Sequence, residues 1–451
     1  MEGNSLDTII SLAKHRGFIY PSSDIYGGFK SSYDYGPLGV ELKNNIKRLW
    51  WREMVYKRDS IVGLDAAIMM AHQVWEASGH TSAGFADLLS ECEACHKRWR
   101  RDHAGDVCPD CGGNLSEPKK FNLLVSTHLG PVEDESSLAY MRPETAQGIF
   151  VNFGLVAQSS RKKLPFGIAQ IGKAFRNEIT PGPFTFRMRE FEQMEMQWFC
   201  YPPATPGKQS PQEWFEYWKK ERFAWYESIG IAPDKLRFHN HEKDELAHYA
   251  KAAVDIEYEY PWGWGEFEGI HNRGDWDLSN HAKHSGKTMG VFDDELQENI
   301  TPHVIETSGG VDRCALVALI DAYRVQEVKG EERVYFAFHP SVAPVKAAVL
   351  PLVKNNENIV AFAKKIAARL RGRWLIQYDE AGTVGKRYRR QDEIGTPFCI
   401  TIDFESLEDK KVTVRNRDTM EQERIPVEEL ENYLNTNINA AHDTIGGFSA
   451  E

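Results

Sequence analysis

Apolar residues recur at helical spacing near the start of the chain. Leu6–Ala13 predicts a short helix, and the apolar positions from Val40 to Tyr56 predict a long amphipathic helix. A loop rich in Gly and Tyr, residues 26–37, separates these helices, and Ile61–Met70 is an apolar run typical of a strand. The chain therefore opens with a helix, a loop, a second helix and a strand.

The middle of the chain mixes strand and helix patterns. Strand-like segments between Phe166 and Phe199 flank a turn at residues 180–183, which predicts a hairpin with a charged stem. Gln212–Ile229 predicts a helix. A second helix is predicted to start at Ala247 and to end at Tyr260 in alternating acidic and aromatic residues. His303–Arg313 predicts a strand and a turn, and Cys314–Val325 predicts an apolar helix.

The composition changes at residues 335–344, and beyond this point strand and helix patterns alternate. The predicted elements are strands at Ala347–Val353, Trp374–Tyr378, Phe398–Phe404 and Val412–Arg415, with a helix at Ile359–Leu370. Such alternation is typical of a small α/β domain with a partly parallel sheet.

Composition and charge narrow the class of protein. The 451 residues are 41% hydrophobic and 27% charged, which suits a globular protein of two or three units. Met1–Lys14 is a poor signal peptide, and no stretch reaches the roughly 18 apolar residues that span a bilayer, so we expect a cytoplasmic protein without membrane contact. The net charge of −12 argues against coating nucleic acid by bulk positive charge. Residues 361–390 nevertheless hold nine Lys or Arg against two Asp or Glu, which fits either an RNA contact or a solvated face.

Four of the seven cysteines form two close pairs, Cys92-x-x-Cys95 and Cys108-x-x-Cys111. Two such pairs separated by a short loop can place four thiolates tetrahedrally around one Zn²⁺. The alternatives are four free thiols or two disulfides. Four sulfur ligands would leave no open position on the metal, so we expect a structural rather than a catalytic zinc.

The predicted hairpin carries arginines, an aromatic ring and acids. Alternation along a strand places on shared faces Arg176 with Glu178, and Arg187 with Arg189, Phe191, Gln193 and Glu195. Such a face is costly as a core, whereas arginines bind phosphates in a fork geometry and a Phe ring stacks on a base. The pattern predicts the floor of a nucleotide site, with a solvated hairpin face as the alternative.

A second chemical pattern runs from Glu306 to Arg313 and reads Glu-Thr-Ser-Gly-Gly-Val-Asp-Arg. Two glycines before a helix allow a ligand to approach the backbone closely. An ordinary turn between a strand and a helix is the alternative.

Together these segments are similar to a known family. Arg-x-Glu at 176–178 with Arg-x-x-x-Phe at 187–191 resembles motif 2 of class II aminoacyl-tRNA synthetases, and Gly-x-Asp-Arg at 310–313 resembles motif 3. Further segments resemble the dimeric type of glycyl-tRNA synthetase, and these are residues 31–39, 75–80, 141–150, 171–178 and 388–397. The resemblance covers residues 6–435, which is nearly the whole chain.

The resemblance implies an α/β (α+β) fold in which an antiparallel catalytic sheet of six or seven strands is flanked by helices and followed by an α/β anticodon-binding domain. The catalytic domain would span residues 1–337, with a zinc-binding insert at 92–111 and an insertion at 200–300 between motifs 2 and 3. The anticodon-binding domain would span residues 338–451. A homodimer would be built partly on the helix and strand from Val40 to Trp75.

The chain departs from the family pattern in two places. Met69–Val74 lacks the proline that the family has late in motif 1, which leaves the fine geometry of the dimer interface open. Thr307 stands where the family has the proline of Glu-Pro-Ser before motif 3.

The activity implied by the resemblance is activation of glycine with ATP and Mg²⁺, followed by transfer of glycine to the 3′ end of tRNA-Gly. Arg176 and Arg313 would be the catalytic residues, and no protein nucleophile is needed. The implied ATP site comprises Arg176, Asn177, Glu178, Phe186, Arg187, Met188, Arg189, Glu190, Phe191, Glu266, Phe267, Gly310, Val311, Asp312 and Arg313.

The implied glycine site comprises Arg100, Glu144, Phe191, Glu192, Gln193, Met194, Glu195, Glu306, Thr307, Ser308, Gly309 and Gly310. Its three glutamates Glu144, Glu195 and Glu306 would bind the ammonium, and Arg100 the carboxylate. Acids crowded around the α-carbon would exclude alanine by overlap, so an editing domain is not required. The implied tRNA contacts are Arg387, Arg389 and Arg390.

Two other functions stay open at this point. A class II synthetase for threonine, proline or histidine shares the scaffold, although the three glutamates and the Gly-Thr-Pro-Phe segment at Gly395 favour glycine. A non-catalytic nucleic-acid-binding protein on this scaffold would have no reason to keep together Arg176, Glu178, Arg187, Phe191 and Arg313.

Overall fold

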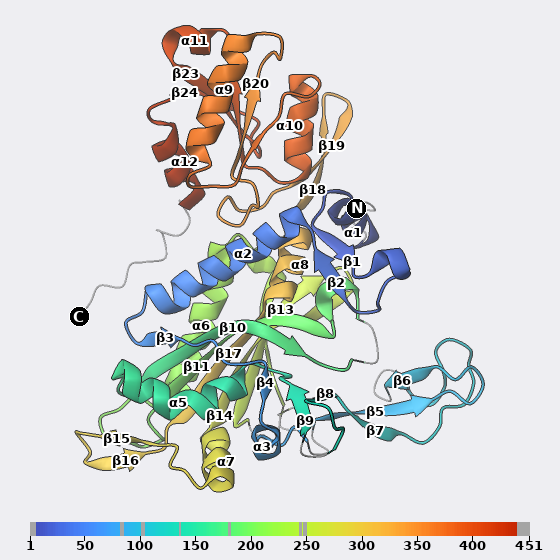
Figure 1. Cartoon of the computed structure of the whole chain (residues 1–451), viewed down its shortest axis with the longest axis vertical. Coiled ribbons are helices and arrows are strands. Elements are labelled where there is room, and N and C mark those ends of the chain that lie inside the picture. Colours follow the sequence, from blue (N-terminus) through green and yellow to red (C-terminus); the bar gives the residue numbers. More distant parts are fainter. Residues whose placement is uncertain are drawn as a thin grey trace.

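The computed structural model describes residues 6–81, 85–100, 104–134, 137–178, 182–242, 246 and 250–439. The chain forms two units: a large body built on one wide sheet, and a smaller α/β unit, orange and red in Figure 1, that stands above it. A three-stranded insert projects sideways from the large body (Figure 1). Within the described ranges no helix is long and apolar enough to cross a membrane.

A seven-stranded sheet forms the centre of the large body. Its strand order is β12-β13-β14-β17-β11-β10-β3, and each neighbouring pair is antiparallel except β10 with β3. The strands are β3 (Ile61–Gly63), β10 (Phe166–Phe175), β11 (Glu190–Cys200), β12 (Leu236–Asn240), β13 (Ala252–Tyr260), β14 (Gly263–Gly274) and β17 (His303–Gly310). This confirms the antiparallel sheet that the resemblance implies.

The helix expected from Ala247 to Tyr260 is wrong, because residues 252–260 form strand β13. Buried residues such as Val254 and Tyr258 alternate along it with acidic residues on the other face. That two-residue period is the signature of a strand with one buried face. Residues 247–249 lie outside the described residues.

One face of the sheet is covered by helices α6 (Pro211–Ser228) and α8 (Val311–Ala322), and α2 (Pro37–Trp51) packs on α8. The helix expected at Gln212–Ile229 is confirmed, and it begins with a capping box in which the Ser210 side chain accepts from the backbone N–H of Glu213. Helix α8 begins at Val311, earlier than the expected Cys314, so Arg313 lies in its first turn.

The opposite face is only partly covered. Helices α5 (Ala146–Ser160) and α7 (Trp276–Ser285) pack over the end of the sheet where β10 and β11 meet, around an apolar cluster that includes Phe153, Phe166 and Phe199. Among the described residues, no helix covers the other end of this face, and the cavity described below lies there.

The N-terminal segment supports helix α8 from outside. Helix α1 (Leu6–His15) confirms the first predicted helix, and α2 continues through the π-helical turn η2 (Arg52–Tyr56), which confirms the second. Gly39 lets α2 pass close to the preceding chain, since a Cβ there would lie 1.8 Å from the backbone oxygen of Phe18. The other elements here are β1 (Ile19–Pro21), η1 (Asp24–Tyr26), β2 (Tyr33–Tyr35), β4 (Met69–Met70) and α3 (His72–Ala77).

Smaller sheets complete the large body. The projecting insert has strand order β6-β5-β7, and β4-β9-β8 joins it to the body. The remaining elements are β5 (Ala86–Glu91), β6 (Arg98–Arg100), β7 (Lys119–Asn122), β8 (Val125–His128), β9 (Leu138–Met141), η4 (Phe184–Phe186), η5 (Pro233–Lys235), β15 (Val291–Asp293), β16 (Glu298–Ile300), β18 (Tyr323–Val328) and β19 (Glu331–Phe336).

The C-terminal unit is a five-stranded sheet of order β21-β20-β22-β23-β24, in which β20 is parallel to β21 and β22 and the other neighbours are antiparallel. This confirms the expected small α/β domain with a partly parallel sheet. Its elements are β20 (Ala347–Pro351), α9 (Glu357–Leu370), β21 (Ile376–Tyr378), α10 (Val384–Glu393), β22 (Phe398–Ile402), α11 (Glu405–Asp409), β23 (Lys411–Asn416), β24 (Gln422–Pro426) and α12 (Leu430–Asn439).

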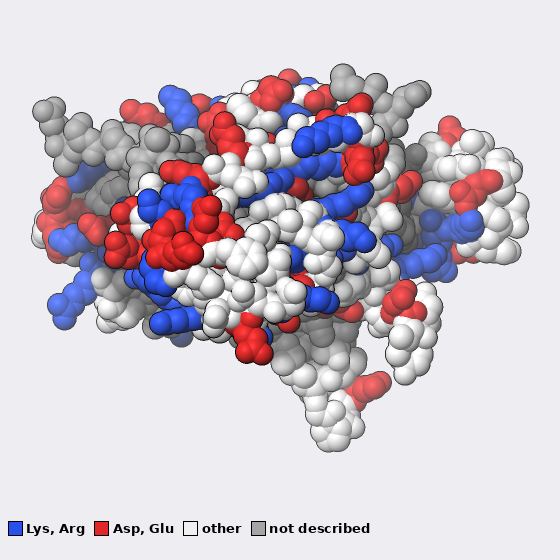
Figure 2. Space-filling model, turned by 90° about the horizontal axis from the view of Figure 1, so that it is seen from above, with Lys and Arg blue, Asp and Glu red and all other residues white. Residues whose placement is uncertain are grey.

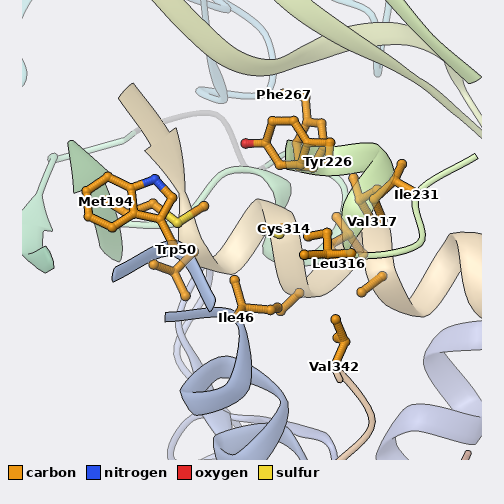
Figure 3. Close-up of a cluster of buried hydrophobic side chains, with 14 of the residues drawn as sticks. Ile46, Trp50, Met194, Tyr226, Ile231, Phe267, Cys314, Leu316, Val317 and Val342 are labelled. Atoms are coloured by element: carbon orange, nitrogen blue, oxygen red, sulfur yellow. The ribbon is translucent and has the colours of Figure 1, made fainter. Parts of the chain in front are cut away.

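The boundary between the two units lies later than the expected residue 337. Phe338, Val342, Ala343 and Val345 belong to the same buried apolar cluster as α2 and α8. Figure 3 shows Val342 pointing toward Leu316 of α8. The core of the large body therefore extends to residue 345.

A buried lysine fixes this connecting segment. The ammonium of Lys346 donates hydrogen bonds to the backbone oxygens of Pro340, Ser341 and Ala343 at 3.0, 2.6 and 2.7 Å. The Asn45 amide of α2 donates to the backbone oxygens of Val342 and Ala343. These contacts give the segment a defined path along α2.

Ion pairs also join the C-terminal unit to the large body. Arg333 of β19 and Arg415 of β23 both bind the buried carboxylate of Asp392 at the end of α10. Arg16, the residue after α1, pairs with Glu393. A buried carboxylate between two guanidinium groups depends on both partners, so this junction resists separation.

We expect a chain that ends at Ala337 to unfold, because it lacks five buried residues of the large core, Phe338, Val342, Ala343, Val345 and Ile394. Loss of one large buried side chain costs about 2–5 kcal/mol, and the whole stability of a domain is about 5–15 kcal/mol. A chain that ends at Val345 keeps all of this cluster except Ile394, so it should be more stable than the shorter chain, although it lacks the contacts of Lys346 and Asp392. Circular-dichroism melts compare the two, and equal melting of both truncated chains would contradict the boundary at residue 345.

Candidate active site

A cavity lies on the uncovered part of the sheet. Its floor is formed by β11, β14 and β17, and its rim by the segment between β10 and β11 and by the start of α8. The lining residues are Glu144, Arg176, Glu178, Thr185, Phe186, Arg187, Met188, Phe191, Glu192, Gln193, Glu195, Glu266, Phe267, Gly269, His271, Glu306, Ser308, Gly310, Asp312 and Arg313. All except Thr185, Gly269 and His271 belong to the ATP or glycine sites that the sequence resemblance implies.

The predicted alternation on the hairpin holds only for its second strand. Phe191, Gln193 and Glu195 of β11 share the face that lines the cavity. The expectation is wrong for the arginines, because β10 ends at Phe175 and β11 begins at Glu190. The segment between these strands, rather than the strands themselves, carries Arg176, Glu178, Arg187 and Arg189.

Glu195 lies at the acidic end of the cavity. Its side chain accepts hydrogen bonds from the Thr145 hydroxyl at 2.6 Å, the Ser308 hydroxyl at 2.7 Å and the Gln193 amide at 2.8 Å. The residue is 2% exposed. Burial raises the pKa of Glu195 to about 8, and the neighbouring carboxylates of Glu306 and Glu144 add to this shift.

Glu306 and Glu144 have charged partners. The Glu306 carboxylate accepts from Nη1 of Arg273 at 3.0 Å and lies 2.8 Å from Nδ1 of His271. Although burial opposes ionisation, Arg273 and His271 hold the pKa of Glu306 at about 2. Glu144 lies 3.5 Å from Nε2 of His80. Burial alone would raise the pKa of Glu144, but the His80 imidazole and Arg273 lower it.

A buried network holds these partners in place. Asp277 of α7 binds the Arg273 guanidinium through two hydrogen bonds of 2.7 and 2.9 Å. The Gln147 amide of α5 donates to both Glu144 and Asp277, and its oxygen lies 2.8 Å from Nε2 of His281. Helices α5 and α7 therefore orient the acidic end of the cavity.

The other end of the cavity is cationic and aromatic. The Arg176 guanidinium lies 5.3 Å from the centre of the Phe191 ring, and the Arg313 guanidinium 4.5 Å from that of Phe186. Arg313 also pairs with Glu266 at 3.0 Å and lowers the pKa of that carboxyl. Flat guanidinium groups and rings of this kind suit phosphates and a purine base.

A buried ion cluster links this end to helix α2. Asp312 accepts from the Lys43 ammonium at 2.6 Å and from the backbone N–H of Glu192 at 2.6 Å. Lys43 and Lys47 lie 3.1 and 3.0 Å from the Glu192 carboxylate. Since Asp312 precedes Arg313, the cluster fixes the first turn of α8 against β11.

Some predicted site residues do not line the cavity, and these are Arg100, Asn177, Arg189, Glu190, Met194, Thr307, Gly309 and Val311. Met194, Thr307 and Val311 are fully buried, and Met194 and Val311 belong to the core under the sheet. Arg100 lies on β6 of the projecting insert, with Nη1 3.3 Å from Oδ1 of Asp87. Arg100 is therefore not among the residues that line the cavity, and its contact with glycine stays a prediction.

The predicted tRNA contacts lie on α10, and one of them is wrong. Arg387 is 2% exposed and donates to the backbone oxygens of Pro351 and Leu352, so its side chain holds the fold together. Arg389 is exposed beside Glu393, and Arg390 pairs with Asp379. Seen from above in Figure 2, Lys and Arg side chains intermix with Asp and Glu.

The four paired cysteines form one cluster. Their sulfur atoms lie within 4.8 Å of one another, with 3.5 Å between Cys92 and Cys111 and 3.7 Å between Cys95 and Cys108. A tetrahedral zinc with Zn–S bonds of about 2.3 Å would separate its sulfurs by about 3.8 Å, whereas a disulfide needs about 2.05 Å. The cluster therefore fits a metal ion rather than disulfides.

The two halves of the cluster have the same backbone geometry. The N–H of His96 donates to the oxygen of Cys92, and the N–H of Gly112 donates to the oxygen of Cys108. Both donor residues have positive φ, 56° and 71°. This repeated turn aims each pair of sulfurs at a common centre.

Sequence reasoning missed His271, Arg273 and Lys43. His271 and Arg273 follow Glu266 on β14, and Lys43 sits within an amphipathic helix, so each looks like an ordinary surface residue in the sequence. Their partners Glu306, Asp277 and Asp312 lie far along the chain.

Comparisons with known proteins agree with this geometry. Residues 131–323 match the family described as tRNA synthetase class II core domain (G, H, P, S and T), and residues 346–437 match the family described as anticodon binding domain. The glycine–tRNA ligase of Thermobifida fusca is 53% identical over 460 residues, covering 96% of this chain and 98% of that protein. Those of Treponema denticola and Borreliella burgdorferi are each 52% identical and cover 96% of this chain and 97% of theirs.

The second matched region begins at residue 346, where the core of the large body ends. The first contains the acidic segment before α5, the whole hairpin and the first turn of α8. The cavity, the C-terminal unit and sequence identity of this extent together show that the chain belongs to the glycine–tRNA ligases, a family of class II aminoacyl-tRNA synthetases.

Proposed function

We propose that this chain activates glycine with ATP and then transfers it to the 3′ end of tRNA-Gly. The observation that carries the proposal is the division of one cavity into a cationic, aromatic end and an end with three buried carboxylates. A nucleoside triphosphate suits the first end and a small ammonium compound suits the second.

In the first step the glycine carboxylate attacks the α-phosphorus of ATP, and pyrophosphate leaves. Negative charge develops on phosphate oxygens, so fixed cations accelerate this step. We assign Arg176 to the α-phosphate, since it lines the cavity beside Phe191 and its Nε donates to the backbone oxygen of Pro143, the residue before Glu144. Phe191 and Arg313 would enclose the adenine, and Arg187 would bind the γ-phosphate. In the second step a ribose hydroxyl of the terminal tRNA adenosine attacks the adenylate.

Selection of glycine would rest on space as much as on charge. The substrate has no side chain, so its ammonium and carboxylate must supply the recognition. Glu144, Glu195 and Glu306 converge on the position of the ammonium, and the Ser308 hydroxyl is held beside them by Glu195. A methyl group on the α-carbon would meet these side chains, which rejects alanine without an editing site.

Mg²⁺ would bind between ATP and an acidic side chain of the hairpin. Glu178 fits this role, because its Oε2 is buried and has no hydrogen-bond partner within the described part of the chain. A hard cation prefers such an oxygen ligand, and it would neutralise part of the phosphate charge.

We further propose that the four cysteines hold a structural zinc. The cluster lies on the projecting insert (Figure 1). Because sulfur would fill all four coordination positions of the zinc, the metal would have no open position for catalysis. The described residues of the insert contribute nothing to the four buried apolar clusters of the chain, so the metal would supply much of its stability.

A homodimer is our third proposal. Ile25 and Tyr26 are 88% and 87% exposed, and Phe29 is also exposed. Phe29 and Val40 line one surface cleft together with the start of α2, the helix that the family uses for pairing. An apolar surface of this kind marks a protein contact.

The C-terminal unit would contact the anticodon stem, with exposed Arg389 as a phosphate ligand.

The activity is tested by glycine-dependent ATP–pyrophosphate exchange. We expect exchange with glycine, and none with alanine or threonine. Arg176→Ala should lower the exchange rate by roughly 10²–10³, because one preorganised donor to a charged transition state is lost. Arg369→Ala in the C-terminal unit is the control and should exchange like the parent. Exchange by Arg176→Ala within threefold of the parent would refute the assignment of that arginine.

Zinc analysis of protein purified without chelators should give one zinc per chain. Cys95→Ser should lose this metal and loosen the insert, while Cys399→Ala, which changes a buried cysteine of the C-terminal unit, should retain it. Protein with reduced cysteines and no bound zinc would contradict the proposed site.

Sedimentation should show a dimer, and Ile25→Ser with Tyr26→Ser should shift it toward monomer. Both side chains are exposed in one chain, so the change should leave the fold of that chain intact. Leu155→Ser removes a residue that is 66% exposed on α5 and serves as the control. A monomeric parent chain at micromolar concentration would rule out the dimer.

A further inference from the structure

The three glutamates of the cavity differ in the charge of their partners. Glu306 contacts a guanidinium and an imidazole, and Glu144 lies against the imidazole of His80. Glu195 receives its hydrogen bonds from two hydroxyls and an amide, which are all neutral groups. Among the three, Glu195 therefore has the weakest compensation for a buried negative charge.

The charged groups that face Glu195 are mostly acidic. Glu306 lies on the adjacent strand β17, two residues from Ser308, which is the register partner of Glu195, and Glu144 comes from the segment before α5. The cations of β14 are already engaged, since Arg273 and His271 bind Glu306. A third buried negative charge beside two others is costly unless a cation or a proton neutralises it.

A further cation near Glu195 does not relieve this charge directly. Arg142, after β9, donates to the backbone oxygens of Lys173 and Ala66 at 2.6 and 2.7 Å, and these bonds fix its guanidinium. The raised pKa of Glu195, about 8, follows from burial and from its acidic neighbours. At neutral pH the empty cavity therefore favours a protonated carboxyl at this position.

The side-chain oxygen of Gln193 can accept a hydrogen bond from a ligand. Oε1 of Gln193 is buried and lacks a hydrogen-bond partner within the described residues, while the amide nitrogen of the same side chain donates to Glu195. An unpaired buried acceptor costs about 1–3 kcal/mol, so its presence beside Glu195 favours a ligand with N–H groups.

We propose that Glu195 carries a proton when the amino-acid site is empty, and that the ammonium of the incoming substrate replaces this proton, which passes to solvent. The inference rests on the proposed function. The O–H bond of the carboxyl breaks, the proton goes to water or buffer, and the carboxylate pairs with the ammonium of a zwitterionic glycine. The net charge of the site changes by the charge of that one proton.

Proton release makes glycine binding depend on pH with a defined sign. The free protein holds one proton more than the complex, so affinity for glycine rises with pH until Glu195 ionises in the free protein. Below pH 8 the affinity should fall by up to about tenfold for each pH unit. Above pH 8 the dependence should flatten.

Calorimetric titration of the full chain with glycine tests this directly. The heat of binding is measured at pH 7 in phosphate and in Tris, whose heats of ionisation differ. We expect release of close to one proton per glycine, which declines with a midpoint near pH 8. In pyrophosphate exchange, KM for glycine should fall about tenfold from pH 6 to pH 7, with a much smaller change in kcat.

Two variants locate the proton. Glu195→Gln keeps the shape of the side chain without a titrating group, so any glycine it binds should release no proton. Asp294→Asn removes an exposed carboxylate outside the cavity and should leave the release close to one. If Glu195→Gln binds no glycine, the parent protein still decides the matter through its pH midpoint.

The outcomes separate this inference from the proposed function. Glycine binding without proton release at pH 7, or a midpoint below pH 7, overturns the inference and leaves the activity standing. Absence of both glycine binding and glycine-dependent exchange overturns the proposed function itself.

Discussion

Burial of three carboxylates, two on one face of the sheet and one in the segment before α5, is the constraint on which the large body depends. Buried charges are tolerated only when other groups pair with them. The Arg273 guanidinium meets this need for Glu306, and Asp277 fixes that guanidinium in turn. Helices α5 and α7 supply Gln147 and Asp277, so their position over the sheet follows from the charges beneath them as well as from apolar packing. The acidic end is thus assembled by elements far apart in the chain.

Patterns of short range were enough to predict much of the fold. The helical spacing of α1, α2, α6 and α9 and the two strands of the hairpin were readable, because each has one clearly apolar face. The segment 252–260 was misread, since its acidic residues and aromatic rings suit a helix end as well as a strand. The boundary between units was placed too early for a related reason: Phe338 and Val342 resemble a linker in sequence, and only tertiary packing shows that they belong to the core.

The site residues also fall into those that local sequence patterns predict and those that only tertiary structure places. Local motifs pointed to Arg176, Phe191, Glu195 and Arg313, and all four line one cavity. Arg100 and Arg387 were assigned by resemblance and charge alone. Arg100 does not line the cavity, and Arg387 is buried. An arginine in sequence carries no sign of its surroundings, so a buried structural role such as that of Arg387 is visible only when its carbonyl partners from β20 and the segment after it are in place.

Helix α2 shows how one element can join these separate requirements. Its Lys43 holds Asp312 and Glu192, and through them the first turn of α8 that carries Arg313. Two residues later, Asn45 binds the backbone of the segment that leads to the C-terminal unit. The start of the same helix borders the exposed apolar loop that we assign to the dimer contact. A rigid helix with three such attachments cannot shift at one of them without strain at the others. Contact with a second subunit or with RNA on the C-terminal unit would therefore act on the position of Arg313 by way of α2.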